Sequence, residues 1–155
     1  GHVVEVKFLE AAVDDAALSP LTGLPRLKSL SLSDTAVSDA GLQTVGTLKS
    51  LRELDLRGCK ISNAGLAALA GLTELQKLRL NGKNGATQVD DDALAAVAQM
   101  KRLKVLLLDQ LWVGEAGLVK LDQLSELEEL PLAGPQVGDE GSVAEGSDRD
   151  DEGRP

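Results

Sequence analysis

The most constraining feature of this sequence is a set of seven apolar positions that recurs every 24 residues. The set is clearest from Leu27 to Leu48 and from Leu51 to Leu72, and every position in it holds an apolar residue. A fixed period of this length is typical of solenoids, in which each repeat is one structural unit stacked on its neighbours. The two clearest sets are Leu27, Leu30, Leu32, Val37, Leu42, Val45, Leu48 and Leu51, Leu54, Leu56, Ile61, Leu66, Leu69, Leu72.

The same register covers most of the chain. It starts at Val3, slips by four residues after Leu80, resumes at Val89 and fades after Val137. We therefore expect one repeat domain over residues 1–141, followed by an acidic, disordered tail over residues 142–155. The expected repeats are residues 3–26, 27–50, 51–74, 75–102, 103–126 and, in part, 127–141.

The spacing inside each repeat predicts one strand and one short helix. The first three apolar positions, as in Leu51, Leu54 and Leu56, end in the alternation of a half-buried strand. The later positions, such as Leu66 and Leu69, are three residues apart and fit a short α-helix or a 3₁₀ turn. Strands that all run the same way form a parallel sheet, so we expect an α/β solenoid of about six repeats.

Two further positions of the repeat bear on the helices. Residues that favour helix N-termini precede the helical segments, and we expect their side chains to accept hydrogen bonds from the first turn. Three residues later each repeat has Gly or Ala, which suggests that neighbouring backbones pack closely there. The first group is Asp14, Ser38, Ser62 and Asp90, and the second is Ala17, Gly41, Gly65, Ala93, Gly117 and Gly141.

The repeats resemble a known family. The segments "LKSLSLSDTAVSDAGLQTVGTLKS" and "LRELDLRGCKISNAGLAALAGLTE" are similar to leucine-rich repeats, and more narrowly to the bacterial 24-residue type and its cysteine-containing relatives. The resemblance implies a curved solenoid with its sheet on the concave side, usually a scaffold for binding proteins. It also implies a ladder position whose side chain binds the loop backbone. That position is held here by Ala11, Thr35, Cys59, Thr87, Leu111 and Pro135.

Charge and cysteine content narrow the choice of partners and compartment. The net charge is −9, and no basic stripe is present, so we expect neither nucleic acid nor an anionic membrane as partner. The single cysteine, Cys59, rules out an intrachain disulfide and favours a cytoplasmic location. No signal-peptide pattern opens the sequence, which agrees with that expectation.

The sequence offers no catalytic constellation. His2 is the only histidine, so no Ser/His/Asp or Cys/His arrangement can form, and Cys59 is expected to be a buried structural thiol. Asp90, Asp91 and Asp92 resemble a calcium site, but a helix cap and an acidic first turn explain them better. We therefore predict a protein that is not an enzyme and that binds no metal or cofactor.

The candidate binding residues lie on the outward face of the sheet and on the loops beside it. Charged residues occupy the outward positions of the middle strands. They suggest a binding surface, and the alternative explanation is a solvated sheet face with cross-strand ion pairs. An exposed Trp112 beside the inserted loop suggests a binding hot spot; alternatively it packs under that loop. The candidate residues for partner binding are Arg57, Arg79, Val105, Leu107, Leu111, Trp112, Asn81 and Asn84.

The sequence supports two hypotheses about function. The first is a non-enzymatic scaffold for protein–protein interaction that uses the concave face and the adjacent loops. The second is a structural spacer cut from a larger protein, which the halting of the repeat after Val137 suggests.

Overall fold

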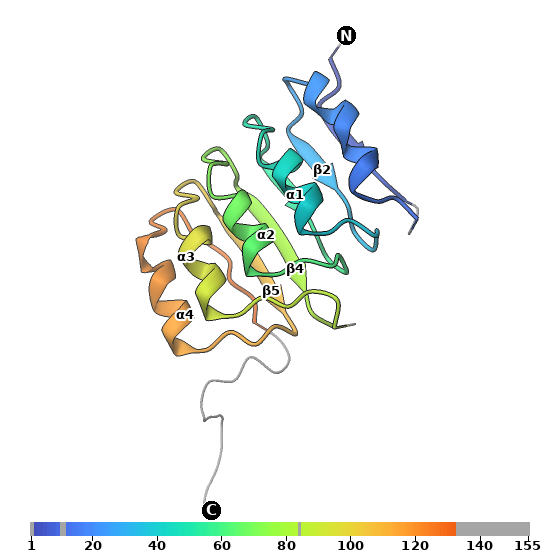
Figure 1. Cartoon of the computed structure of the whole chain (residues 1–155). Coiled ribbons are helices and arrows are strands. Elements are labelled where there is room, and N and C mark those ends of the chain that lie inside the picture. Colours follow the sequence, from blue (N-terminus) through green and yellow to red (C-terminus); the bar gives the residue numbers. More distant parts are fainter. Residues whose placement is uncertain (1, 10–11, 84, 133–155) are drawn as a thin grey trace, which may run out of the picture.

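The computed structural model describes residues 2–9, 12–83 and 85–132 and forms a single stack of repeats (Figure 1). Strands lie on one side of the stack and helices on the other, as the 24-residue pattern predicts. The strands are β1 (Glu5–Lys7), β2 (Ser29–Ser31), β3 (Glu53–Asp55), β4 (Lys77–Asn81) and β5 (Val105–Asp109). The helices are η1 (Asp15–Gly23), α1 (Asp39–Val45), α2 (Asn63–Ala68), η2 (Asp91–Ala93), α3 (Leu94–Val97), α4 (Glu115–Lys120) and η3 (Leu121–Gln123), where η marks 3₁₀ geometry.

The five described strands form one parallel sheet in the order in which they occur along the chain. Leu30, Leu54, Leu78 and Leu106 are partners across neighbouring strands, so the register of the sheet is the register of the sequence repeat. These leucines and most of the other apolar repeat positions are at most 1% exposed, and they form one continuous core between sheet and helices. The α/β solenoid expected from the sequence is confirmed.

Within the described residues no regular strand follows β5, in keeping with a sixth repeat that was expected only in part. Among the described residues, Glu129 meets β5 only in an isolated bridge to Val105, in which the Leu106 N–H donates to the Glu129 carbonyl at 3.0 Å. Pro131 follows at the next outward position and has no N–H to donate, so the ladder cannot continue there. The tail predicted over residues 142–155 lies outside the described residues.

The helix starts differ in part from the expectation. Asp14 accepts a hydrogen bond from the Ala16 N–H at 3.1 Å, and Asp90 accepts one from the Asp92 N–H at 3.0 Å, as caps do. Ser38 and Ser62 do not cap their own helices. Their hydroxyls donate instead to a carboxylate of the preceding repeat.

That carboxylate belongs to a ladder that joins consecutive helices. Asp39 accepts hydrogen bonds from the Ser62 N–H at 2.8 Å and from the Ser62 hydroxyl at 2.6 Å. A charged acceptor strengthens such bonds, and the Ser62 N–H belongs to the group that a helix start leaves without an internal partner. The N–H bonds of the ladder join Asp15 to Ser38 at 2.7 Å, Asp39 to Ser62 at 2.8 Å, Asn63 to Asp90 at 3.1 Å and Asp91 to Gly114 at 2.6 Å.

The glycines of the repeat make room for this ladder. A Cβ on Gly65 would collide with the carboxylate of Asp39, and Gly41 and Gly117 stand in the same relation to the preceding repeat. The expected close backbone packing holds at Gly117, where a Cβ would also lie 3.0 Å from the Asp91 Cα. At Gly41 and Gly65 the atoms nearest to such a Cβ belong to side chains, chiefly the carboxylate, so the expectation is wrong there. Ala93 occupies this position opposite Asn63, where the ladder bond is the longest of the four.

The inner ladder implied by the family resemblance is present in the middle repeats. Thr35 donates to the Leu32 carbonyl at 2.8 Å, Cys59 to the same carbonyl at 3.0 Å, and Thr87 to the Cys59 carbonyl at 2.9 Å. All three side chains are buried. Leu111 breaks the pattern because it has no polar atom and packs into the core instead.

Candidate functional site

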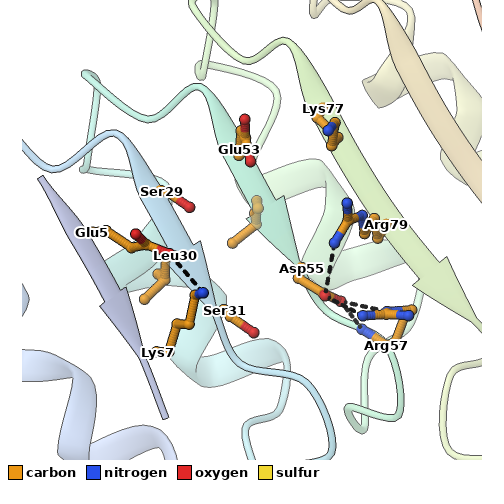
Figure 2. Close-up of a pocket in the computed structure, with 11 residues that line it drawn as sticks. Glu5, Lys7, Ser29, Leu30, Ser31, Glu53, Asp55, Arg57, Lys77 and Arg79 are labelled. Atoms are coloured by element: carbon orange, nitrogen blue, oxygen red, sulfur yellow. Dashed lines mark hydrogen bonds and ion pairs between the residues drawn. The ribbon is translucent and has the colours of Figure 1, made fainter.

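The outward positions of β1 to β4 line a groove on the face of the sheet that is turned away from the helices. We call it the sheet groove; its volume is about 410 Å³. Ser29 and Ser31 are small and half-buried, and they form a low floor between the charged side chains of β1 and those of β3 (Figure 2). Outward residues alternate with core leucines because successive side chains of a strand point to opposite faces.

A network of charges centred on Asp55 occupies one end of the sheet groove. Arg57 binds the Asp55 carboxylate through two nitrogens, at 2.9 and 2.6 Å, and Arg79 of the next strand lies 3.6 Å from it (Figure 2). Burial raises the pKa of Asp55, but the hydrogen bonds from Arg57 and the charge of Arg79 outweigh it and hold that pKa below its ordinary value. The same hydrogen bonding raises the pKa of Arg57 above its ordinary value. The carboxylate is thus kept ionised and the two guanidinium groups are held in place.

The other charges of the groove are less tightly held. Glu5 and Lys7 form an exposed ion pair at 2.9 Å on β1. Glu53 and Lys77 are partners across β3 and β4, yet no ion pair joins them among the described residues. Exposed pairs contribute about 0–1 kcal/mol, so these side chains can exchange partners with a bound molecule at little energetic cost.

An apolar strip follows directly on the charged one. Val105 and Leu107 occupy the outward positions of β5, where they are in register with Lys77 and Arg79. Both are half-buried, although the alternating Leu106 and Leu108 are fully buried. The sheet face therefore offers cations on β4 next to aliphatic side chains on β5.

The structure divides the candidate binding residues into groups. Arg57 and Arg79 line the sheet groove, and Val105 and Leu107 continue the same face. Asn81 lies at the end of β4, where it lines a neighbouring hollow together with Arg57 and Lys83. Trp112 lines a separate hollow at the loops that follow the strands, and no residue of that hollow also lines the sheet groove.

The structure corrects the prediction for Leu111 and decides between the two interpretations of Trp112. Leu111 is 1% exposed and belongs to the core, so the proposal that it touches a partner is wrong. Its lack of a polar atom lets it fill the ladder position as an apolar residue. Trp112 is 69% exposed, so it does not pack beneath the inserted loop. Asn84 lies outside the described residues.

The positions examined for chemistry have structural roles. Cys59 is fully buried, and burial raises the pKa of its thiol, as expected of a structural cysteine. Asp90 caps a helix, and Asp91 accepts the Gly114 N–H at 2.6 Å while its carbonyl accepts from Lys120 at 2.9 Å. Within the described ranges no three His, Cys, Asp or Glu side chains are placed to share a metal ion. In the same ranges no helix has the length and hydropathy of a membrane span.

Sequence reasoning missed several residues of the sheet face as site residues. Asp55 organises the arginines, and Ser29 and Ser31 create the depression, yet none of the three was proposed as part of a site. The signal was present in the outward strand positions, where two serines stand beside strands of charged residues. Residues that shape a surface are harder to recognise than residues that project from it.

Comparisons with known proteins agree with this architecture. A family model described as leucine rich repeat matches residues 25–85. No curated protein sequence matches the chain. Among solved structures, an internalin (inlF) from Listeria monocytogenes is 17% identical with a TM-score of 0.57, and the match covers 96% of this chain and 48% of that one. The tropomodulin C-terminal domain of Caenorhabditis elegans is 16% identical with a TM-score of 0.54, covering 81% and 82% of the two chains.

A third structure, that of PEPR1–AtPEP1, is 20% identical with a TM-score of 0.53. The match covers 84% of this chain and 18% of that one. The chain spans about half the length of two Listeria internalins, at 54% and 48%. At these identities the structures show a shared fold, and the bacterial 24-residue subtype stays a prediction. Residues 25–85 match the leucine-rich repeat model, and the parallel sheet and the continuous leucine core show that the described residues have the fold of a leucine-rich repeat solenoid.

Proposed function

We propose that this protein is a non-enzymatic scaffold that binds a protein partner across its outer sheet face. The observation that carries the proposal is the arrangement of that face, in which a charged groove over β1–β4 adjoins the apolar strip of Val105 and Leu107. Contact surfaces between proteins commonly combine an apolar centre with a polar rim. The fold supports the proposal in a general way, because solenoids of this kind present extended surfaces for binding.

The electrostatics of the face suit recognition better than catalysis. Asp55 holds Arg57 and Arg79 in defined positions, so a partner meets guanidinium groups that have already lost much of their freedom. Such preorganisation lowers the entropic cost of association. Arginines of this kind are also frequent among the residues that dominate binding energy. We propose Arg57, Arg79, Val105, Leu107 and Asn81 as contacts with the partner.

The proposal is tested by substitutions on the two sides of the stack. The partner is captured with the purified chain, identified by mass spectrometry and produced in purified form for binding measurements. Leu107→Ser and Arg79→Glu are expected to weaken its binding at least tenfold, which corresponds to about 1.4 kcal/mol or more. Val119→Ser is the matched control, since Val119 is an exposed aliphatic residue of α4 on the helix side.

The outcome separates the two faces. Loss of binding from the sheet-face variants, with Val119→Ser unchanged and all variants equally folded by circular dichroism, supports the proposal. Equal binding by all of them excludes the outer sheet face as the interface. The spacer hypothesis gains support if the purified chain retains no partner, and sequencing the gene on both sides of this segment then tests it.

A further inference from the structure

The most exposed aromatic side chain of the described residues lines a hollow that the sheet face does not use. Trp112 is 69% exposed, and it is the only tryptophan in the sequence. The hollow has a volume of about 480 Å³ and lies at the loops that follow β4 and β5. We call it the Trp112 hollow. It is lined by Gly82, Gly85, Thr87, Gln88, Val89, Asp90, Gln110 and Trp112.

Backbone pairing holds the walls of this hollow together. Trp112 and Asp90 are partners in a parallel bridge, so the indole and the carboxylate start from adjacent positions. The Gly82 N–H donates to the Asp109 carbonyl at 3.0 Å, which ties the inserted loop to the segment before Gln110. The arrangement therefore does not depend on the side chains that a ligand would contact.

Several polar groups in the hollow have no partner among the described residues. Asp90 accepts hydrogen bonds from Asn63 at 2.8 Å and from the Asp92 N–H at 3.0 Å, both on Oδ1, so that no described residue pairs with Oδ2. The side-chain amides of Gln88 and Gln110 form no hydrogen bond within the described part of the chain. Gln110 also holds a φ of 60°, a region that Gly58 occupies in an earlier repeat and that is unfavourable for a residue with a side chain.

The composition of the hollow decides which ligand fits. An apolar side chain placed on the indole would cover the two amides and the carboxylate without pairing them, and each buried unpaired group costs roughly 1–3 kcal/mol. A sugar ring avoids this cost, because its C–H face packs on an indole while its hydroxyls bind amides and carboxylates at the edge. From these contacts we infer that the Trp112 hollow is a binding site for a neutral saccharide.

Charge and size refine the inference. Of the described residues that line the hollow, Asp90 alone is ionisable, so uronic acids and other anionic sugars are disfavoured. Small-molecule sites usually range from about 300 to 1,000 Å³, and this hollow lies in the lower part of that range, which suits one or two sugar rings. The site shares no residue with the sheet groove, so the inference does not depend on the proposed protein interface.

The single tryptophan makes the test direct. With no tyrosine in the sequence, emission excited near the indole absorption band comes from Trp112 alone. We would titrate the full chain with cellobiose, chitobiose, maltose and mannobiose, each to about 20 mM, a range that covers weak binding in the millimolar regime. At least one disaccharide is expected to produce a saturable change in emission, and glucuronic acid to produce none.

Variants and a second probe assign the response. Gln88→Ala combined with Gln110→Ala keeps the reporter and is expected to weaken binding at least tenfold. Lys60→Ala is the control at the equivalent exposed position of an earlier repeat and should change nothing. A glycoprotein tested before and after enzymatic removal of its glycans distinguishes a glycan carried by a protein from a free saccharide.

Three results would overturn the inference. The first is the absence of any saturable response to the four disaccharides and to the glycoprotein. The second is a saturable response that the double glutamine variant retains unchanged. The third is saturation by an apolar peptide such as hexaproline in the absence of any response to sugars, which would reassign the hollow to peptide binding.

Discussion

Substitution of Gly65 by alanine tests the carboxylate ladder, because two physical effects predict opposite signs for it. Gly65 lies inside α2, and alanine is favoured over glycine in a helix by about 1 kcal/mol. Helix propensity alone therefore predicts that Gly65→Ala stabilises the protein. The structure predicts the reverse, because the new methyl group would collide with the Asp39 carboxylate and approach Leu42 Cδ1 to 3.0 Å.

The magnitude follows from the bonds that Asp39 would lose. Its carboxylate accepts the Ser62 N–H at 2.8 Å and the Ser62 hydroxyl at 2.6 Å, and displacing it weakens both. A hydrogen bond to a charged group contributes about 1.5–3 kcal/mol. After the gain from helix propensity, we expect Gly65→Ala to lower the free energy of unfolding by about 1–3 kcal/mol.

A double-mutant cycle in urea measures this coupling. In an Asp39→Ala background the carboxylate is gone, so adding Gly65→Ala is expected to be neutral or to stabilise by up to about 1 kcal/mol. Gly23→Ala is the matched control, since a Cβ there meets no atom within 4 Å, and it should lie within about 0.5 kcal/mol of the parent. The explanation is refuted if Gly65→Ala stabilises the parent, or if its effect is the same in both backgrounds.

Three further predictions follow from the core, the Asp55 network and Cys59. Leu54→Ala, at a fully packed repeat position, should lower the free energy of unfolding by roughly 2–5 kcal/mol. Arg52→Ala on the surface should change it by less than about 0.5 kcal/mol. Similar effects at both positions would mean that the register is wrong. Because the folded-state pKa of Asp55 is lowered, its contribution to stability is present above its unfolded pKa and is lost as the pH falls through the folded pKa. Asp55→Asn should therefore flatten the acid side of a profile of unfolding free energy against pH. An unchanged profile would count against the network. Cys59 should react with a thiol reagent only at the rate of unfolding in urea, and rapid labelling of the native protein would show that the thiol is accessible.

Much of the fold was predictable because the repeat determines which residues are buried. The strand register and the core leucines follow directly from the 24-residue period, since a strand and a short helix place apolar side chains at different spacings. The caps at Ser38 and Ser62 were predicted wrongly because their partners lie in the preceding repeat. A signal did exist: Asp15, Asp39 and Asp91 each precede the glycine that accommodates them by a constant 26 positions.

The candidate surface was predictable only in part. The outward strand positions were correct, because alternation along a strand determines them once the register is known. The positions of the loop residues were harder to predict, since the four inserted residues interrupt the 24-residue register. β4 and β5 are longer than the other strands. Trp112 shares a hollow with Gly82 and Gly85 of the inserted loop, with which it had been grouped, but Val105 and Leu107 do not line that hollow.

Methyl NMR of the chain with its captured partner is the most direct test of the proposed scaffold function. Leucine and valine methyl groups lie on both sides of the stack, so one spectrum reports on the sheet face and the helix face together. The proposal predicts that adding the purified partner shifts or broadens the methyl signals of Val105 and Leu107 and leaves those of Val119 unchanged. Changes centred on Val119, with Val105 and Leu107 unaffected, would contradict it.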